Sequence, residues 1–193
     1  MTRRSRRRSD RRKSSPRSGK PVGAAPDGDR AHATALRVRL LDDGASAELV
    51  HPRCAAQRRE DLEEVEAMLS AGEFEVARDE LRWLLDGCSD LVEAHLKLGE
   101  IAVAEGDVPL ARGHFGYACQ VCEAALRGRP LVRLPYELAA NRAFFEAAKG
   151  AAWCLAQLGR RQDAERIAER MLALDPSDPL GFGTLRQELD AAD

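Results

Sequence analysis

The first apolar pattern along the chain alternates with a period of two. Leu36, Val38 and Leu40 are separated by arginines, a turn-forming Asp-Asp-Gly sequence follows, and residues 47–50 can form a return strand. This pattern predicts a short β-hairpin within residues 34–52. Because two strands alone are marginally stable in water, we expect the hairpin to pack on the rest of the chain or to pair with another chain.

After Pro52 the apolar period becomes that of helices, and the helical pattern repeats. Three residues of one unit, Gly72, Ala77 and Leu81, recur 34 residues later as Gly106, Ala111 and Phe115. A third unit around Gly159 is displaced by 53 residues, which we interpret as one further unit and an insertion of 19 residues. The predicted segments are helix pairs over 58–91, 92–125 and 145–178, a loop over 126–144 and a capping helix within 179–193. Leu81, Phe115 and Trp153 are expected to fill the space between successive pairs.

The helix–turn–helix unit of 34 residues resembles the tetratricopeptide repeat. The matching residues are Leu98-Gly99, Gly106, Ala111, Phe115 and Ala118 in the second unit, and Ala152, Gly159, Ala164 and Asp175-Pro176 in the third. The third unit lacks the family's bulky aromatic residue early in its first helix. The first unit has charged Asp61 and Glu64 where the family prefers apolar residues. Over residues 58–178 the resemblance implies an all-α fold, a solenoid of antiparallel helix pairs with a right-handed superhelical twist.

In tetratricopeptide repeat proteins the first helices of successive repeats line a concave groove that holds an extended peptide or a partner helix. The resemblance therefore implies a non-catalytic adaptor for protein–protein interaction, with no cofactor or metal. The corresponding groove residues are Glu66, Glu93, Leu96, Glu100, Glu146, Lys149 and Trp153. This mainly acidic groove departs from the Lys and Asn pattern that clamps the C-terminal carboxylates of chaperones. A basic or amphipathic segment fits better, the chain's own N-terminal segment included, although ordinary solvated helix faces have the same composition.

The charge distribution supports a second hypothesis. The formal net charge is −2, but residues 1–20 carry +9 and the remainder carries −11. Residues 1–33 are rich in Arg, Ser, Pro and Gly, which predicts a disordered tail. Such a tail is either a solubilising extension or a nonspecific phosphate-binding element, so the alternative function is an RNA- or ribosome-associated protein. The candidate contacts are Arg3, Arg4, Arg6, Arg7, Arg8, Arg11, Arg12 and Lys13.

The cysteines and histidines give little support to an enzyme or a metal protein. Five scattered cysteines favour reduced thiols and a cytoplasmic location, and the excess of Arg over Lys suggests a bacterial source. Cys119 and Cys122 have the spacing of redox and zinc motifs, but they continue an apolar helical stripe, so we interpret both thiols as buried. His95 and His114 are expected at the surface or in the groove. No apolar stretch reaches the roughly 18 to 20 residues of a membrane span, and we expect a monomer or a weak homo-oligomer.

Overall fold

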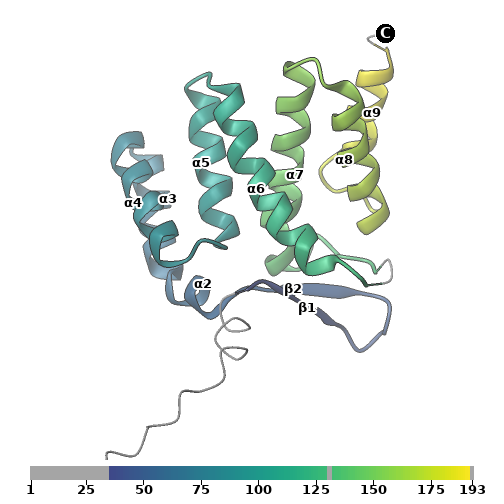
Figure 1. The fold of residues 1–193 in the computed structure, drawn as a ribbon, viewed down its shortest axis with the longest axis horizontal. Coiled ribbons are helices and arrows are strands. Elements are labelled where there is room, and N and C mark those ends of the chain that lie inside the picture. Colours follow the sequence, from purple (N-terminus) through teal and green to yellow (C-terminus); the bar gives the residue numbers. More distant parts are fainter. Residues whose placement is uncertain (1–34, 130–131, 192–193) are drawn as a thin grey trace, which may run out of the picture.

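The structure is a computed structural model that describes residues 35–129 and 132–191. The predicted basic tail, with its candidate nucleic-acid contacts Arg3 to Lys13, lies outside the described residues. Within them the chain forms a two-stranded sheet followed by eight helices (Figure 1). In chain order these are β1 (Arg37–Leu40), β2 (Ala47–Val50), α2 (Arg53–Gln57), α3 (Arg59–Ser70), α4 (Phe74–Gly87), α5 (Val92–Ala104), α6 (Val108–Leu126), α7 (Ala139–Gln157), α8 (Arg161–Leu174) and α9 (Phe182–Ala191).

Helices α3 to α9 follow one another across the molecule, and each packs against the next (Figure 1). Gly72, Gly106 and Gly159 lie in the short turns that connect α3 to α4, α5 to α6 and α7 to α8. Their φ angles are 80°, 80° and 73°, a left-handed conformation that glycine reaches without a clash at Cβ. The described chain is therefore mostly helical, with turns at the glycines that the repeat pattern singled out.

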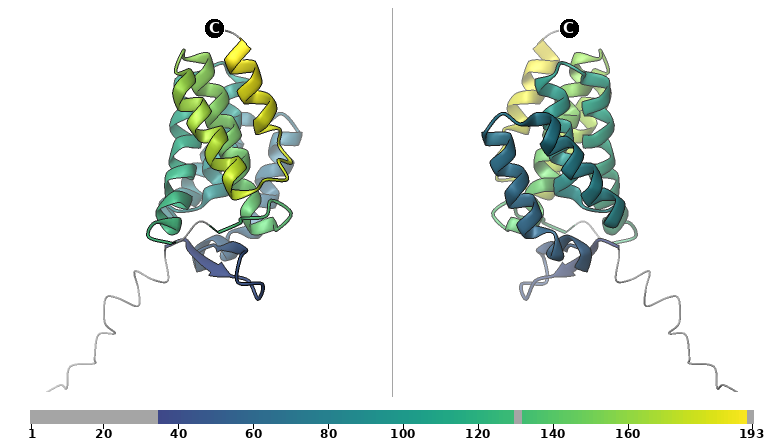
Figure 2. Two further views of the ribbon diagram at one scale, coloured as in Figure 1. Left: turned by 90° about the vertical axis from the view of Figure 1, so that its right-hand side faces the viewer. Right: turned by 90° about the vertical axis from the view of Figure 1, so that its left-hand side faces the viewer.

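The structure contains the predicted hairpin, within residues 34–52. β1 and β2 are antiparallel, with Val38 opposite Leu49, and the Asp43 side chain accepts hydrogen bonds from the backbone of Ala45 and Ser46 in the turn. Leu36, Val38, Ala47 and Leu49 are buried in one core with residues of α6 and α7. The hairpin crosses one end of the row of helices (Figures 1 and 2). It therefore packs on the helices of its own chain, which the sequence left open.

A buried asparagine fixes the hairpin to α7. Asn141 is completely buried, and its Oδ1 accepts a hydrogen bond of 2.9 Å from the backbone N–H of Leu49. Its Nδ2 donates to the carbonyl oxygens of Ala47 at 3.3 Å and Pro135 at 2.8 Å. Backbone groups on the outer edge of β2 are thus satisfied by one side chain, which offsets the cost of burying them.

The segment expected as a loop over 126–144 is shorter in the structure. α6 ends at Leu126 and α7 already begins at Ala139, and both helices have 19 residues. The reason is that Ala143 and Phe144 continue the buried face of α7, so the helix extends for as long as it buries apolar surface. The remaining connector pairs with the hairpin, because the backbone N–H of Ala47 donates to the Arg133 carbonyl.

The core between α5, α6 and α7 is built around one aromatic ring. Phe115 of α6 is 3% exposed and lies between Gly99 of α5 and Gly150 of α7. A Cβ atom added at Gly99 would lie 2.5 Å from the ring, and one added at Gly150 would lie 2.7 Å from it. The two glycines therefore let the neighbouring helices approach the ring more closely than alanine would permit.

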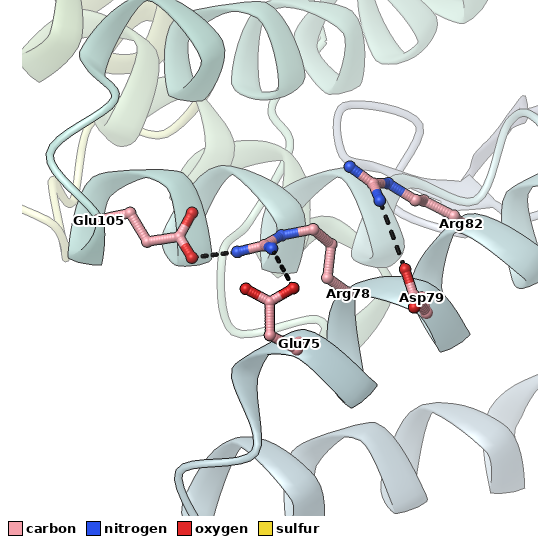
Figure 3. Close-up of polar contacts among 5 residues, drawn as sticks. All are labelled: Glu75, Arg78, Asp79, Arg82 and Glu105. Atoms are coloured by element: carbon pink, nitrogen blue, oxygen red, sulfur yellow. Dashed lines mark hydrogen bonds and ion pairs between the residues drawn. The ribbon is translucent and has the colours of Figure 1, made fainter.

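An arginine joins the first two helix pairs at the surface. Arg78 of α4 forms ion pairs with Glu75 in its own helix and with Glu105, which follows α5 (Figure 3). These contacts raise the pKa of Arg78, chiefly through the hydrogen bond to Glu75. Nearby, Arg82 and Asp79 form a longer pair of 3.4 Å. Because the carboxylates of all three ion pairs are accessible to water, the pairs orient these side chains but contribute little to stability.

A disulfide links Cys54 of α2 to Cys88, directly after α4, with a Cα–Cα distance of 5.7 Å. The expectation of reduced thiols is therefore wrong for these two cysteines, whereas Cys119, Cys122 and Cys154 are free. The partners are 34 residues apart in sequence, and they come together because α2 folds back over the core formed by α3, α4 and α5. Counting cysteines does not reveal such a contact, because it depends on tertiary packing.

Candidate functional site

The strongest candidate site lies on the face formed by α3, α5 and α7. Five of the seven predicted groove residues line one cavity of about 400 Å³: Leu96, Glu100, Glu146, Lys149 and Trp153. The cavity also includes Val103, Phe115, Gly150 and Leu180, so its wall is predominantly apolar. We call it the apolar hollow. Its volume lies within the range of pockets that bind small ligands or anchoring side chains.

Trp153 dominates the apolar hollow. It is 40% exposed although it lies on α7 between buried neighbours, so it does not fill the space between helix pairs as the sequence suggested. Leu81 and Phe115 are both buried between helix pairs as expected, and Phe115 fits there against two glycines. Leu96 is only 4% exposed and contributes to the floor of the hollow. A large aromatic side chain left half in water is a suitable anchor for a partner's apolar side chain.

The polar rim of the apolar hollow is held by contacts within the chain. Tyr136 donates a hydrogen bond of 2.8 Å from its hydroxyl to Oε1 of Glu146, and this bond raises the pKa of Tyr136. Lys149 donates through Nζ to the backbone carbonyl of Leu180, in the segment between α8 and α9. Glu100 lies 3.3 Å from Nζ of Lys97. The rim is therefore ordered before any partner binds.

The other two predicted groove residues, Glu66 and Glu93, line a second cavity of about 580 Å³. We call it the acidic hollow, because Glu48 and Glu63 line it as well. Its remaining lining includes Ala55, Ala56, Leu62, Leu138, Ala139 and Ala140, together with Arg59 and His51. The predicted groove is thus divided into two hollows, one mainly apolar and one with four carboxylates at its edge.

His51 and Glu93 meet at the wall of the acidic hollow. Nε2 of His51 lies 2.8 Å from the Ala140 carbonyl oxygen and therefore carries a proton, while Nδ1 lies 3.6 Å from Oε1 of Glu93. The second carboxylate oxygen of Glu93, Oε2, is buried and has no hydrogen-bond partner among the described residues. His51 Nδ1 is also buried without a hydrogen-bond partner among these residues, so the His51–Glu93 contact leaves two polar atoms unsatisfied beneath the wall of the hollow.

A histidine pair lies between α5 and α6. Nδ1 of His95 and Nδ1 of His114 are 3.4 Å apart, and the His95 ring stacks at 4.4 Å on Tyr117. Desolvation lowers the pKa of His95 to about 4 and also lowers the pKa of His114. Both rings are half-buried and line neither hollow, which differs from the expected place at the surface or in the groove, and both are neutral at pH 7.

The Cys119 and Cys122 motif does not form a reactive site. Cys122 is completely buried and Cys119 is half-buried on the same helix. Desolvation raises the pKa of Cys119 to about 12 and raises that of Cys122 well above its usual range. Both side chains are therefore protonated thiols at physiological pH, which makes them poor nucleophiles and poor metal ligands.

Two further properties concern the described residues as a whole. Between residues 35 and 129 and between 132 and 191, no three His, Cys, Asp or Glu side chains are grouped closely enough to hold a metal ion. In the same ranges, none of the helices has the combination of length and apolar character that a bilayer crossing requires.

Sequence reasoning missed several residues that shape the two hollows. Phe115 comes from α6 and Leu180 from the segment before α9, outside the helices that the resemblance assigned to a groove. His51 follows β2, and Ala140 belongs to the segment that was expected to be a loop. No local signal marks these residues, because they reach the site only through the packing of the hairpin and of the α8–α9 connection. In comparisons of the whole chain, no family model, no curated protein and no solved structure matches it.

Proposed function

We propose that the protein is a non-catalytic adaptor of the tetratricopeptide repeat type, a right-handed helical solenoid whose α3, α5 and α7 face binds a segment of a partner protein. The observation that carries the proposal is the apolar hollow, which the half-exposed Trp153 lines together with buried Leu96 and Phe115. Tryptophan is enriched among the residues that dominate the energetics of protein interfaces. A preorganised rim of charged groups around an aromatic anchor suits recognition of a side chain better than it suits catalysis.

The chemistry of the two hollows defines the partner segment. An apolar side chain of the partner packs on Trp153 in the apolar hollow. A lysine or arginine of the partner enters the acidic hollow, where the exposed side chains of Glu63 and Glu66 supply negative charge. The partner is therefore a basic, amphipathic segment, bound as an extended peptide or as a helix. Electrostatic attraction of this kind accelerates association and weakens with salt.

The alternative function is nucleic-acid binding through the Arg-rich residues of the N-terminal segment. Its support comes from the sequence, where residues 1–20 carry +9. This alternative predicts a steep loss of binding with salt and loss of binding when the chain begins at Ala31. The adaptor hypothesis instead places the determinants of binding in Trp153 and in the acidic hollow.

The cellular setting also stays a proposal. A cytoplasmic, bacterial protein follows from the composition, whereas the Cys54–Cys88 disulfide is typical of proteins exposed to oxidising conditions. The two features are compatible if the bond forms after exposure to oxidant. A redox titration of this bond, followed by thiol labelling, would show in which compartment it is stable.

The experiment that tests the adaptor function is selection of binders from a random peptide library displayed on phage, with the full chain as bait. We expect the selected peptides to be enriched in Lys, Arg and large apolar residues. Trp153→Ala is expected to weaken their binding at least tenfold, because it removes the anchor. Trp83→Ala is the matched control, since Trp83 is also exposed, at 54%, but lies on α4 and lines neither hollow.

Two results would contradict the adaptor proposal. One is a set of selected peptides that bind equally well to wild type and Trp153→Ala. The other is that binding to the chain requires only residues 1–30 and is abolished by nuclease, which would make nucleic-acid binding the primary function. Thermal unfolding of each variant, followed by circular dichroism, serves to show that loss of binding is not loss of fold.

A further inference from the structure

A third cavity, of about 410 Å³, lies between α6, α7 and α8 and shares no residue with either hollow. Its floor is apolar and includes the side chains of Phe144, Ala148, Ala151, Leu155 and Met171, all of which are buried. Cys119 also faces it, and because burial raises the pKa of this thiol to about 12, it adds a neutral surface. The floor therefore favours an apolar group.

The rim of this cavity is cationic. Arg112 of α6 and Arg160, Arg166 and Arg170 at the start and along α8 line it, against two carboxylates. We call it the arginine-rimmed pocket. The formal charge of its lining is therefore positive, although the chain beyond residue 20 carries −11.

The ion pairs in the rim leave positive charge uncompensated. Arg170 contacts both oxygens of Glu123, at 2.9 and 3.2 Å, and this pair joins α8 to α6. Asp163 alone serves two guanidinium groups, those of Arg160 and Arg166.

Arg112 has no carboxylate within ion-pair distance among the described residues, so one cation of the rim stands unpaired.

We propose that the arginine-rimmed pocket binds an organic anion that has one carboxylate head group and an apolar body. The apolar body lies on the floor between α6 and α8, and the carboxylate interacts with Arg112 and with the two guanidinium groups that share Asp163. A small inorganic anion would find the cations but leave the floor in water. A neutral apolar molecule would bury the floor but leave Arg112 without a counterion. The combination of floor and rim selects a molecule with both parts.

A glycine provides a direct test of occupancy. Gly116 of α6 lines the pocket, and a Cβ atom added there would meet no atom within 4 Å. The Cβ atom of Gly116→Leu therefore meets no clash, and the larger side chain takes up room at the wall of the pocket. Gly113, one turn earlier on α6, has equally open space and does not line the pocket, so Gly113→Leu is the matched control.

The experiment is isothermal titration calorimetry of the full chain with decanoate below its micelle concentration. Decanoate is expected to bind wild type, Gly113→Leu and Trp153→Ala alike, and to bind Gly116→Leu and Arg112→Gln about tenfold more weakly or worse. Decanol, which lacks the charge, and acetate, which lacks the apolar body, are expected to bind at least tenfold more weakly than decanoate.

The control variants separate this proposal from the adaptor function. Weakening by Trp153→Ala but not by Gly116→Leu would place the anion in the apolar hollow and overturn the proposal. Equal binding to wild type and Gly116→Leu, equal binding of decanol and decanoate, or no binding of decanoate to wild type would overturn it as well. The melting temperature of each variant is measured in parallel, so that an unfolded variant is not counted as a loss of binding.

Discussion

Because Phe115 lies between two glycines, glycine-to-alanine replacements in helix interiors are expected to change the stability of the chain in opposite directions, depending on whether they touch this ring. Gly99→Ala and Gly150→Ala place a methyl group 2.5 and 2.7 Å from the nearest carbon of the Phe115 ring. Gly113→Ala and Gly116→Ala place the same methyl group where no atom lies within 4 Å. All four are the same chemical change in an α-helix, so they differ only in what the new Cβ atom meets.

The magnitudes follow from two opposing effects. Replacing glycine by alanine in a helix interior stabilises the folded chain by about 0.5–1 kcal/mol. Forcing a methyl group into a packed core costs about 1–3 kcal/mol, because neighbouring side chains or the backbone must shift. We therefore expect Gly113→Ala to raise the free energy of unfolding by about 0.5–1 kcal/mol. Gly150→Ala is expected to lower it by about 1 kcal/mol, which is the difference between the middle values of the two effects.

The assay is urea denaturation followed by far-ultraviolet circular dichroism, with the m-value checked for each variant. A Phe115→Leu background provides an internal control, because the smaller side chain leaves room for the added methyl group. In that background, Gly150→Ala is expected to cost at least 1 kcal/mol less than in wild type. The reasoning is refuted if Gly150→Ala stabilises the chain as much as Gly113→Ala does.

Three further predictions concern the disulfide, the histidine pair and the hairpin. The double variant Cys54→Ser, Cys88→Ser is expected to lose about 4 kcal/mol of stability in urea denaturation, because the bond closes a loop of about 34 residues in the unfolded chain; equal stability under oxidising conditions would contradict this. Since burial lowers the pKa of His95 to about 4, the unfolded chain takes up a proton below pH 6.5 before the folded chain does. The stabilisation that neutral His95 provides is therefore complete above pH 6.5, and the free energy of unfolding should fall by about 2 kcal/mol towards pH 4, after allowance for partial solvent screening. His95→Gln should flatten this part of the plot of unfolding free energy against pH. Asn141→Leu leaves the buried Leu49 N–H and Ala47 carbonyl without a partner and should cost about 3 kcal/mol, with faster hydrogen exchange at the Leu49 amide; unchanged exchange would show that the hairpin does not depend on this side chain.

Features set by local chemistry could be predicted from the sequence. The Asp42-Asp43-Gly44 turn and its flanking alternation produce the hairpin, and the structure places Gly72 and Gly106 at turns with positive φ. These residues act through their own backbone conformation and hydrogen bonds, so a short window of sequence contains the information.

Features set by packing could not be predicted. Asn141 lay in a segment expected to be a loop, yet it satisfies the edge of β2, more than 90 residues earlier in the chain. The Cys54–Cys88 bond and the contacts of Phe115 with Gly99 and Gly150 likewise join distant segments. A periodic pattern indicates which face of a helix is buried but not which residue of another helix it meets.

The candidate site was predicted from the sequence in part. The resemblance to a helical repeat directed attention to α3, α5 and α7, and five of the residues it indicated line one cavity. It did not indicate that Leu180 would close one side of that cavity or that Glu66 and Glu93 would line a separate one. The arginine-rimmed pocket had no signal in the sequence, because its cations are spread over α6 and α8, and its floor belongs to α7.

The fluorescence of Trp153 tests the proposed binding role of the apolar hollow most directly. The chain has two tryptophans, so Trp83→Phe leaves Trp153 as the sole indole fluorophore. Titration of this variant with a basic amphipathic peptide from the library selection is expected to give a saturable blue shift, because the half-exposed indole becomes buried. The reciprocal variant Trp153→Phe, which retains Trp83, is expected to show no shift and at least tenfold weaker binding. A peptide that binds without changing the emission of Trp153, or that changes only the emission of Trp83, would contradict the account.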